Sequence, residues 1–276
     1  MRIVIINVIG IIIGCSASTM GATIENHLIE KDKLQTITEK GVIIVASGYG
    51  VPFFYIDSET NQISGIDADI ITEIAKRLGI KKIEVKEVPF ANLLEKLNTD
   101  DSIDIAASGI YITPEREKLV AFTQPLYKET ENIIVPKFSE INFMSDLKNA
   151  VVGVEKGTAF EELAKKWKKN NLIKDIMFFE NSSELLNSIN NKKVDAGISD
   201  SVVVSYLISK NKNLLLRTLK GYTSEIPGAI GIAVRKDEIS LLNALNKTIS
   251  DMKADGTLYT ILVENGLDKS NMSEKK

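Results

Sequence analysis

The stretch Ile103-Asp104-Ile105-Ala106-Ala107-Ser108-Gly109-Ile110-Tyr111-Ile112-Thr113-Pro114-Glu115-Arg116 joins a predicted strand to a predicted helix. Residues 103–107 are largely apolar and short, which is typical of a strand buried in a sheet. Thr113 suits the N-cap of a helix and Pro114 suits the first helical position. A strand that leads through a loop into a helix indicates an α/β fold.

Arg116 is the first candidate binding residue in this stretch. It would lie in the first turn of the helix, where a positive charge is electrostatically unfavourable. A bound anion would remove that penalty, and a guanidinium can hold a carboxylate through two hydrogen bonds. The alternative is a surface residue paired with Glu115 or Glu117.

The residues before this stretch alternate between strands and helices. We expect strands at 42–45 and 83–88 and helices at 67–78 and 90–97. The helix at 67–78 places its apolar residues at a period of 3.6, and Gly79 ends it.

The residues after it repeat the same order. We expect strands at 151–154, 176–179, 194–198 and 231–234, helices beginning at Thr158, Ser183 and Asp200, and a helix at 239–253. Thr158 and Glu161 match a capping box. The pattern predicts two α/β lobes, each with a mostly parallel sheet.

The loops that follow the strands predict where a ligand binds. Open α/β sheets bind ligands beyond the carboxyl ends of their strands. The loops at those ends are 47–52, 108–113, 157–158 and 199–200, two from each half of the chain. A site shared by the two lobes is the expected consequence.

Composition excludes several classes of function. The 276 residues suffice for one large domain or two ordinary ones, and 44% are hydrophobic. A net charge of -3 argues against a nucleic-acid partner. Cys15 and His27 are the single cysteine and histidine, so we expect no intramolecular disulfide, no Cys–His nucleophile pair and no His-rich zinc site. We also expect no cofactor and no other metal ion.

The N-terminus has the pattern of an export signal. Met1-Arg2 supplies positive charge and residues 3–13 form an apolar run that is too short for a comfortable membrane span. Ile12-Ile13-Gly14-Cys15 resembles a bacterial lipobox, so we expect residues 1–15 to be a lipoprotein signal that ends at a lipidated Cys15. The alternative is an ordinary secretory signal, cleaved after Ala17 or Ala22. Residues 16–35 are expected to be a polar tether.

From about residue 41 to 266, the chain resembles the amino-acid-binding branch of the solute-binding proteins of bacterial ABC importers, family 3. The motifs that carry the resemblance are Gly65-Ile66-Asp67-Ala68-Asp69, Ile112-Thr113-Pro114-Glu115-Arg116, Val120-Ala121-Phe122-Thr123-Gln124-Pro125-Leu126-Tyr127, Val152-Gly153-Val154 with Gly157-Thr158, Val194-Asp195-Ala196, Gly231-Ile232-Ala233-Val234-Arg235 and Lys253-Ala254-Asp255-Gly256-Thr257.

This resemblance implies a role for each candidate site residue. Arg116 and Thr158 would hold the α-carboxylate of a small zwitterion, one from each lobe, and Asp200 would accept its α-ammonium. Ser108 and Gly109 would add backbone contacts. From the residues alone, Thr158 and Asp200 are equally suited to plain helix caps, and both interpretations stay open.

The chain departs from the family pattern at the positions expected to set specificity, which are Tyr49, Val51, Ile66 and Tyr111. Aromatic residues that the family usually has are absent at Gly50 or Val51 and at Ile66. Tyr111 replaces a small hydroxyl residue. Tyr111 is either a platform for a ligand cation or a core tyrosine, and an aromatic here also resembles the branch that binds ectoine.

The resemblance further implies two Rossmann-like lobes joined by a two-stranded hinge, the periplasmic-binding-protein type II fold. We expect lobe 1 at 36–132 and 230–268, lobe 2 at 133–229, and a disordered tail at 269–276. The hinge crossings are expected near 133–135 and 229–231.

The expected function is that of a lipid-anchored, monomeric receptor on the extracytoplasmic face of the cell membrane. It would bind a polar amino acid and pass it to an ABC permease, without enzymatic activity. The alternatives are a binding protein for ectoine-like or betaine-like solutes, a sensor or adhesin, and a dehydratase-like enzyme with a glutamate such as Glu155 as acid–base.

Overall fold

The computed structural model describes residues 32–57 and 59–272. The expected signal peptide, Cys15 and most of the expected tether lie outside these residues. The described chain forms two five-stranded sheets and two short two-stranded sheets, with helices on both faces of each large sheet. No helix in the described ranges has the length and apolarity required to span a bilayer.

The sheet of the first lobe has the strand order β4-β1-β5-β14-β6. Its strands are β1 (Val42–Ser47), β4 (Lys82–Glu87), β5 (Ile105–Ala106), β6 (Ala121–Phe122) and β14 (Ala233–Val234). β4 and β5 run parallel to β1, whereas β14 pairs antiparallel with both β5 and β6. The sheet is therefore mixed: β1, β4, β5 and β6 run in the same direction, as we expected of a mostly parallel sheet, and β14 runs against them. β14 follows the return crossing from the second lobe without a helical crossover, and only parallel neighbours require such a crossover.

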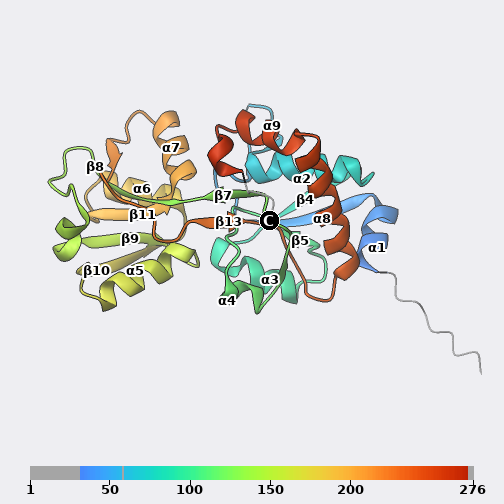
Figure 1. Ribbon diagram of the computed structural model, residues 1–276, viewed down its shortest axis with the longest axis horizontal. Helices are drawn as coiled ribbons and strands as arrows, with labels where there is room; N and C mark the ends of the chain where they lie inside the picture. The colour runs from blue at the N-terminus through green and yellow to red at the C-terminus, as the bar shows by residue number, and fades with distance from the viewer. Residues whose placement is uncertain (1–31, 58, 273–276) are drawn as a thin grey trace, which may run out of the picture. The chain divides into compact units, whose positions relative to one another are not determined.

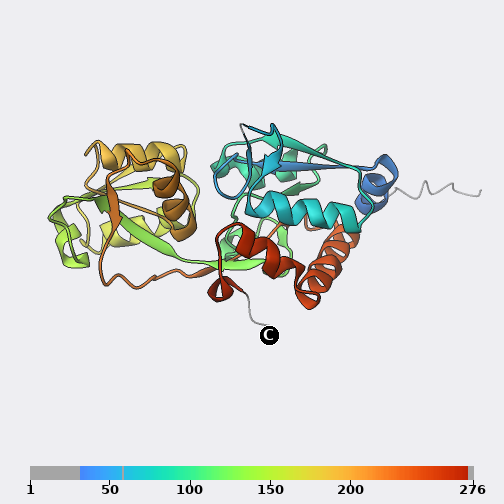
Figure 2. The same ribbon diagram turned by 90° about the horizontal axis from the view of Figure 1, so that it is seen from above.

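Helices cover both faces of this sheet. One face carries α1 (Lys33–Lys40), α2 (Ile66–Arg77), α8 (Ile239–Ala254) and α9 (Thr257–Glu264). Figures 1 and 2 both show α8 and α9 alongside α2. The other face carries η1 (Phe90–Asn92) and α3 (Leu93–Thr99), which pack on Ala46, Ala106 and Ala233. The apolar side of α2, with Ile70 and Ile74, is fully buried, as its period predicted.

The second lobe repeats this design with the strand order β10-β9-β11-β8-β12. Its strands are β8 (Glu131–Pro136), β9 (Val151–Glu155), β10 (Asp175–Phe179), β11 (Ala196–Asp200) and β12 (Leu216–Thr218), and its helices are η2 (Met144–Asn149), α5 (Ala159–Lys169), α6 (Ser182–Asn190) and α7 (Ser201–Lys210). β10 and β11 run parallel to β9, whereas β8 pairs antiparallel with both β11 and β12. The core residues of α5 and α6 belong to different clusters, in agreement with their places on opposite faces in Figure 1.

Two antiparallel strands, β7 (Tyr127–Glu129) and β13 (Gly228–Ile230), connect the two large sheets. The expectation of a first crossing at 133–135 is wrong, because these residues lie in β8 and pair with β11 and β12. The apolar run there fills a buried central strand. The expected second crossing at 229–231 overlaps β13.

The remaining short elements are β2 (Tyr55–Ile56), β3 (Ile63–Ser64), α4 (Pro114–Glu117) and η3 (Lys269–Asn271). The last of these lies in the expected disordered tail. Asn271 donates hydrogen bonds to the Lys128 carbonyl (2.9 Å) and to Glu129 Oε1 (3.0 Å), so residues up to Met272 are held against β7. At the other end, α1 begins within the expected tether because Asp32 accepts a hydrogen bond from the Gln35 N–H and caps it.

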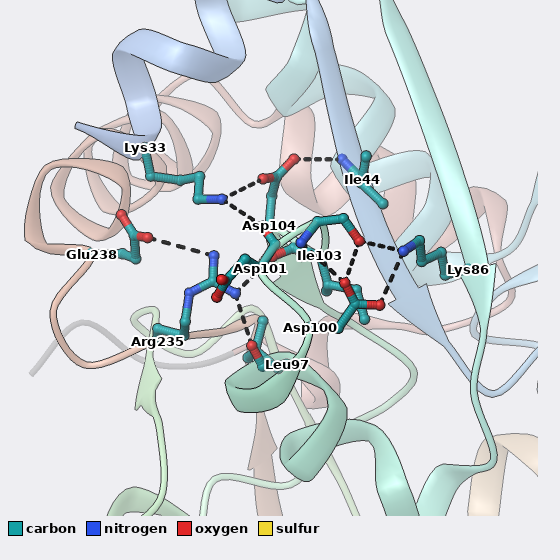
Figure 3. A network of polar contacts seen from close by, with 11 residues as sticks. Lys33, Ile44, Lys86, Leu97, Asp100, Asp101, Ile103, Asp104, Arg235 and Glu238 are labelled. Carbon is teal, nitrogen blue, oxygen red and sulfur yellow. Dashed lines mark hydrogen bonds and ion pairs between the residues drawn. The ribbon is translucent and has the colours of Figure 1, made fainter. Parts of the chain in front are cut away.

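Both lobes use the same device to align their central strands. Asp104 precedes β5 and accepts a hydrogen bond from the Ile44 N–H of the neighbouring strand (2.8 Å). Asp195 precedes β11 and accepts one from the Val151 N–H (2.8 Å). Figure 3 shows Asp104 between Ile44 and Lys33, whose ammonium lies 3.3 Å from the carboxylate. The repeated order of elements thus extends to repeated polar contacts.

A buried arginine closes the same end of the first sheet. The Arg235 guanidinium donates from Nη1 to the carbonyl oxygens of Leu97 (2.8 Å) and Ile103 (2.7 Å), and Nη2 lies 3.5 Å from Glu238 (Figure 3). These contacts join the C-terminal end of α3, the loop before β5 and the chain that follows β14. Arg235 belongs to a motif that carried the family resemblance, and its role here is structural.

Candidate functional site

A cavity of about 500 Å³ lies at the carboxyl ends of β1, β5, β9 and β11. Both lobes line it: Tyr49, Ser108, Tyr111 and Arg116 come from the first, and Thr158 and Asp200 from the second. Its place agrees with the expectation that the strand-end loops of both sheets share one site. Its size lies within the range of small-molecule pockets, about 300–1,000 Å³.

Arg116 lies in this cavity on the short helix α4, which begins as the sequence predicted. Thr113 accepts a hydrogen bond from the Arg116 N–H (3.3 Å) and Pro114 occupies the first turn. Nη1 donates to the Tyr111 carbonyl (2.8 Å) and Nη2 to the Gly157 carbonyl (2.9 Å), so the expected alternative of pairing with Glu115 or Glu117 is wrong.

Three of the five guanidinium N–H groups stay free of these two contacts. Burial lowers the pKa of Arg116 to about 10, against the opposing effect of Asp200. The side chain remains charged at neutral pH, so it offers a fixed cation with open donors to the cavity.

Thr158 occupies the N-cap position of α5, but its side chain does not cap the helix. Its hydroxyl donates to the Glu155 carbonyl (2.7 Å), and Glu161 accepts from the Gly157 N–H (2.8 Å). The capping-box prediction is therefore wrong. The backbone N–H groups at the start of α5 have no partner within the helix and border the cavity.

Asp200 precedes α7, and it too makes no capping bond through its side chain. Glu129, from the hinge strand β7, takes that place: its Oε2 accepts from the Ser201 hydroxyl (2.8 Å) and the Val202 N–H (3.3 Å). The plain-cap interpretation of Asp200 is thus excluded by a residue from another element.

The Asp200 carboxylate is buried and lacks a full set of partners. Its exposed fraction is 8%, and its Oδ1 has no hydrogen-bond partner among the described residues. Burial, and then the nearby Glu129 charge, raise the pKa of Asp200 well above its usual value. Because an unpartnered buried carboxylate is costly, a cation delivered to this cavity would be strongly favoured.

Tyr111 links the two lobes. Its ring stands edge-on to Phe160 of α5, with ring centroids 5.6 Å apart, and is 4% exposed. A Cβ on Gly228 of β13 would lie 2.0 Å from the ring, so glycine is required there. The Tyr111 hydroxyl is buried and has no hydrogen-bond partner among the residues that the structure describes, and burial and the Asp200 charge raise its pKa. The ring therefore packs as a core tyrosine would, while its hydroxyl faces Asp200.

Of the other expected site residues, four line the cavity and Ile66 does not. Ser108 lines the cavity and its Oγ accepts from the Gly48 N–H (3.3 Å). Gly109 also lines it, but its N–H is already donated to the buried Asp67 (2.7 Å). Tyr49 and Val51 line the cavity, whereas Ile66 is fully buried under the sheet and does not. The expectation for Ile66 is therefore wrong.

Several lining residues escaped the sequence analysis as site residues. They are Gly48, Gly50, Phe53, Glu87, Pro89, Phe90, Ala159, Phe160, Glu180, Asn181, Ser182, Ser183 and Val203. Glu155, which we named only for the enzyme alternative, also lines the cavity. Glu87 is the last residue of β4 and Glu180 follows β10, so a search for polar residues at every strand end would have found both.

The model of the family described as "Bacterial extracellular solute-binding proteins, family 3" matches residues 42–265. This chain belongs to that family. Relatives of this solute-binding protein include a probable histidine-binding protein of Neisseria gonorrhoeae, 33% identical over 208 residues, which are 74% of this chain and 75% of the relative. They also include the arginine-binding extracellular protein ArtP of Bacillus subtilis, 30% identical over 80% of this chain and 84% of the relative.

Solved structures give the same fold. An ancestral arginine-binding protein bound to arginine superposes with a TM-score of 0.74 at 32% identity, over 82% of this chain and 98% of that one. An ancestral amino-acid-binding protein described as a precursor of cyclohexadienyl dehydratase superposes with a TM-score of 0.73 at 30% identity, over 84% and 98%. The two sheets and their paired connecting strands are thus the two lobes and the hinge of a type II solute-binding protein.

Proposed function

We propose that this solute-binding protein captures a polar α-amino acid between its lobes and delivers it to an ABC permease. Arg116, with the backbone at Thr158, would hold the α-carboxylate. Asp200 would accept the α-ammonium. The relatives support this proposal, because their names record binding of histidine, arginine, glutamine and cystine.

The observation that carries the proposal is the buried Asp200 carboxylate, whose Oδ1 has no partner among the described residues, in a cavity that also holds Arg116. One buried anion and one fixed cation with free donors suit a molecule that carries both charges. Glu129 supports this division of roles, because it caps α7 and leaves Asp200 for a ligand.

Contacts between the lobes support capture by closure. The Arg116 guanidinium of the first lobe donates to the Gly157 carbonyl of the second, and Gly157 packs against Ala91. A ligand that touches both lobes favours the closed arrangement, and exclusion of water strengthens its charge pairs. Micromolar affinity requires about 8 kcal/mol of net binding free energy.

The proposal also covers the cellular location and the oligomeric state of the protein. We propose that Cys15 carries a lipid that holds the receptor on the extracytoplasmic face of the membrane, and that it acts as a monomer. The expected lobes, residues 36–132 with 230–268 and residues 133–229, remain part of this proposal, except that the first crossing moves to β7 so that all of β8 belongs to the second lobe.

A thermal-shift screen tests the proposed function. The full chain would be heated with each standard amino acid, ectoine, glycine betaine and dicarboxylates, since a ligand that binds the native state raises the melting temperature. We expect an α-amino acid to stabilise the protein. Stabilisation by ectoine or betaine alone would overturn the role of Asp200.

The enzyme alternative is tested in the same samples. Glu155 lies in the cavity and burial raises its pKa to about 7, which suits an acid–base group. We expect chromatography of the stabilising ligand after prolonged incubation to recover it unchanged. Conversion of the ligand would instead support an enzyme on this fold.

A further inference from the structure

The cavity contains more negative charge than the backbone of an α-amino acid can neutralise. Four carboxylates line it, those of Glu87, Glu155, Glu180 and Asp200, against the single guanidinium of Arg116. A zwitterionic backbone brings one charge of each sign and leaves the excess unchanged. Glu87 and Glu180 are exposed at the rim, so the balance matters most for Glu155 and Asp200, which burial separates from water.

One of the four carboxylates already has a cation from the protein. Glu180 forms an ion pair with Lys156, which is the residue next to Glu155 in the chain. The ammonium nearest in sequence to Glu155 is thus committed elsewhere. Asp200 is assigned to the α-ammonium, which leaves Glu155 and Glu87.

Glu155 is the more informative of these two. It ends β9, the strand between β10 and β11, and its Oε2 accepts from the Ser182 hydroxyl (2.6 Å) at the start of α6. This neutral hydroxyl orients the carboxylate but does not balance its charge. No described residue forms an ion pair with Glu155, and burial raises its pKa to about 7. A desolvated carboxylate with an oriented hydrogen bond and no counter-charge suits a cation that arrives with the ligand.

Glu87 approaches the same cavity from the other lobe. It ends β4, and no described residue gives its carboxylate a hydrogen bond or ion pair. Its charge contributes to raising the pKa of Tyr49, so the two side chains are neighbours. Tyr49, Phe53 and Phe90 supply aromatic walls on this side. Aromatic walls with carboxylates from both lobes suit a methylene stem that ends in a positive charge.

We infer that this site selects α-amino acids with a positively charged side chain, which Glu155 of one lobe and Glu87 of the other would neutralise. The inference rests on the proposed function, because it assumes that Arg116 and Asp200 hold the ligand backbone. It adds the class of substrate, the basic amino acids, whose side chain ends in an ammonium or a guanidinium.

The test compares ligands that differ only in charge. Isothermal titration of the full chain would measure arginine against citrulline, which has nearly the same shape without the charge, and lysine against norleucine. We expect arginine or lysine to bind at least about tenfold more tightly than its neutral counterpart. The arginine–lysine comparison shows which cation fits.

Two variants assign the effect to a residue. Glu155→Gln keeps the size and a hydrogen-bond acceptor, and we expect it to weaken binding of the basic ligand at least about fivefold while citrulline changes less than about twofold. Glu140→Gln makes the same chemical change on an exposed residue outside the cavity and should change neither.

The outcomes separate the two proposals. If no α-amino acid binds, the proposed function fails. If α-amino acids bind but citrulline or glutamine binds as tightly as arginine and lysine, the proposed function stands and the charge inference is overturned. Equal loss of both ligands in Glu155→Gln would also overturn it, since that result marks a structural role for Glu155.

Discussion

At the residue scale, the site depends on which group caps which helix. Thr158 and Asp200 both stand where a cap is expected, yet neither side chain caps. Glu129 caps α7 from the hinge, and the Thr158 hydroxyl turns back to the Glu155 carbonyl. The Asp200 carboxylate and the N-terminus of α5 are thereby left for a ligand.

Replacing Arg116 with alanine should abolish measurable binding of the ligand at micromolar concentrations. Removing one partner of a buried charge pair typically costs about 2–5 kcal/mol, which weakens a micromolar affinity by about 30-fold to several thousand-fold. Titration calorimetry of the ligand found in the screen would measure the loss. Lys118→Ala, an exposed cation next to α4, is the control. Binding of Arg116→Ala within a few-fold of the parent would reject the role of Arg116.

The affinity for a basic ligand should rise between pH 6 and pH 8. Burial raises the pKa of Glu155 to about 7, so the free carboxyl is largely protonated at pH 6. A ligand cation binds the ionised carboxylate, so binding at pH 6 must first displace the proton. We therefore expect the affinity for arginine, relative to that for citrulline, to rise by up to about tenfold from pH 6 to pH 8. Calorimetry in buffers of different ionisation enthalpy would also detect proton release near pH 7.

The charged groups around Glu155 do not reverse this sign. The elements packed against β9 bring Asp200 from β11, Asp175 from β10, Glu184 from α6, and Glu161, Glu162, Lys165, Lys166, Lys168 and Lys169 from α5, with Lys156 and Glu180 next to the strands in sequence. Lys156, Lys165, Lys166 and Lys168 are each ion-paired with a carboxylate other than Glu155, and Lys169 is exposed at the C-terminal end of α5. The pKa of Asp200 is also raised, but Asp200 would contact the α-ammonium of both arginine and citrulline. The ratio of the two affinities therefore isolates the effect of Glu155. A ratio independent of pH would contradict the prediction.

At the scale of elements, the loop before α5 brings the two lobes into close contact. Gly157 has φ +74°, and a Cβ there would lie 2.5 Å from Ala91 Cα of η1. Backbone atoms cannot give way as the end of a flexible side chain can. The contact therefore requires glycine when the lobes are closed.

Gly157→Ala should weaken ligand binding more than it lowers stability. The added methyl group keeps α5 from η1, so closure is impaired even though each lobe folds. Gly221→Ala is the matched control, because Gly221 has φ +67° with open space around its Cβ position. We expect similar melting temperatures for the two variants and at least about tenfold weaker binding for Gly157→Ala alone. Equal affinities would show that this contact does not matter.

Arg235→Met should destabilise the protein by about 2–4 kcal/mol. It leaves the buried carbonyls of Leu97 and Ile103 without their donor, and an unsatisfied buried group costs about 1–3 kcal/mol. Urea unfolding would measure the change. Lys236→Met, which removes an exposed ammonium from the Lys118 carbonyl, should cost less than about 0.5 kcal/mol. Similar losses in both variants would refute the argument from burial.

At the scale of the whole molecule, the ligand-free protein should be more stable at pH 5 than at pH 7.5. Burial raises the pKa of Asp67 to about 6 and that of Glu155 to about 7, and raises the pKa of Asp200 well above its usual value. The folded state therefore binds more protons than the unfolded state between about pH 4 and pH 7, and stability falls as the pH rises through that window.

Differential scanning calorimetry of the ligand-free chain checks this prediction. One unit of pKa shift corresponds to about 1.4 kcal/mol, and 1 kcal/mol moves the melting temperature of a protein of this size by about 2–4 °C. We expect a melting temperature at least about 4 °C higher at pH 5. Below pH 4 the trend reverses, because hydrogen bonds hold the pKa values of Asp100 and Asp255 at about 2. A maximum at neutral pH would be inconsistent with these shifts.

Much of this architecture was predictable, because apolar runs and periodic helices are local signals. The strands at β1, β9 and β10 and the helices α2 and α8 lie within a few residues of their predicted bounds. The pairing of the antiparallel strands was not predictable from local signals. For example, β8 has the same apolar character as a hinge crossing. Its pairing with β11 is decided by residues about 65 positions away.

The site divides in the same way. Arg116, Asp200 and Thr158 were found because a motif or a helix start marks each of them. Ile66 was misplaced because its motif position does not show that Pro52 accepts a hydrogen bond from its N–H and holds it under the sheet. Glu155 and Glu87 have no local signal beyond a strand end, and their importance follows from the absence of cations around them, which depends on the whole fold.

Trp167 is the one tryptophan in the chain, and α5 buries it completely in the second lobe. Its indole donates to Glu225 Oε1 (2.9 Å) and its ring stands edge-on to Tyr222, away from the residues that line the cavity. Tryptophan emission, excited selectively above the tyrosine absorption, consequently reports the surroundings of the second lobe alone. An optical titration needs a dye or a second indole placed at the mouth of the cavity, and the unmodified emission then serves as an internal reference for folding.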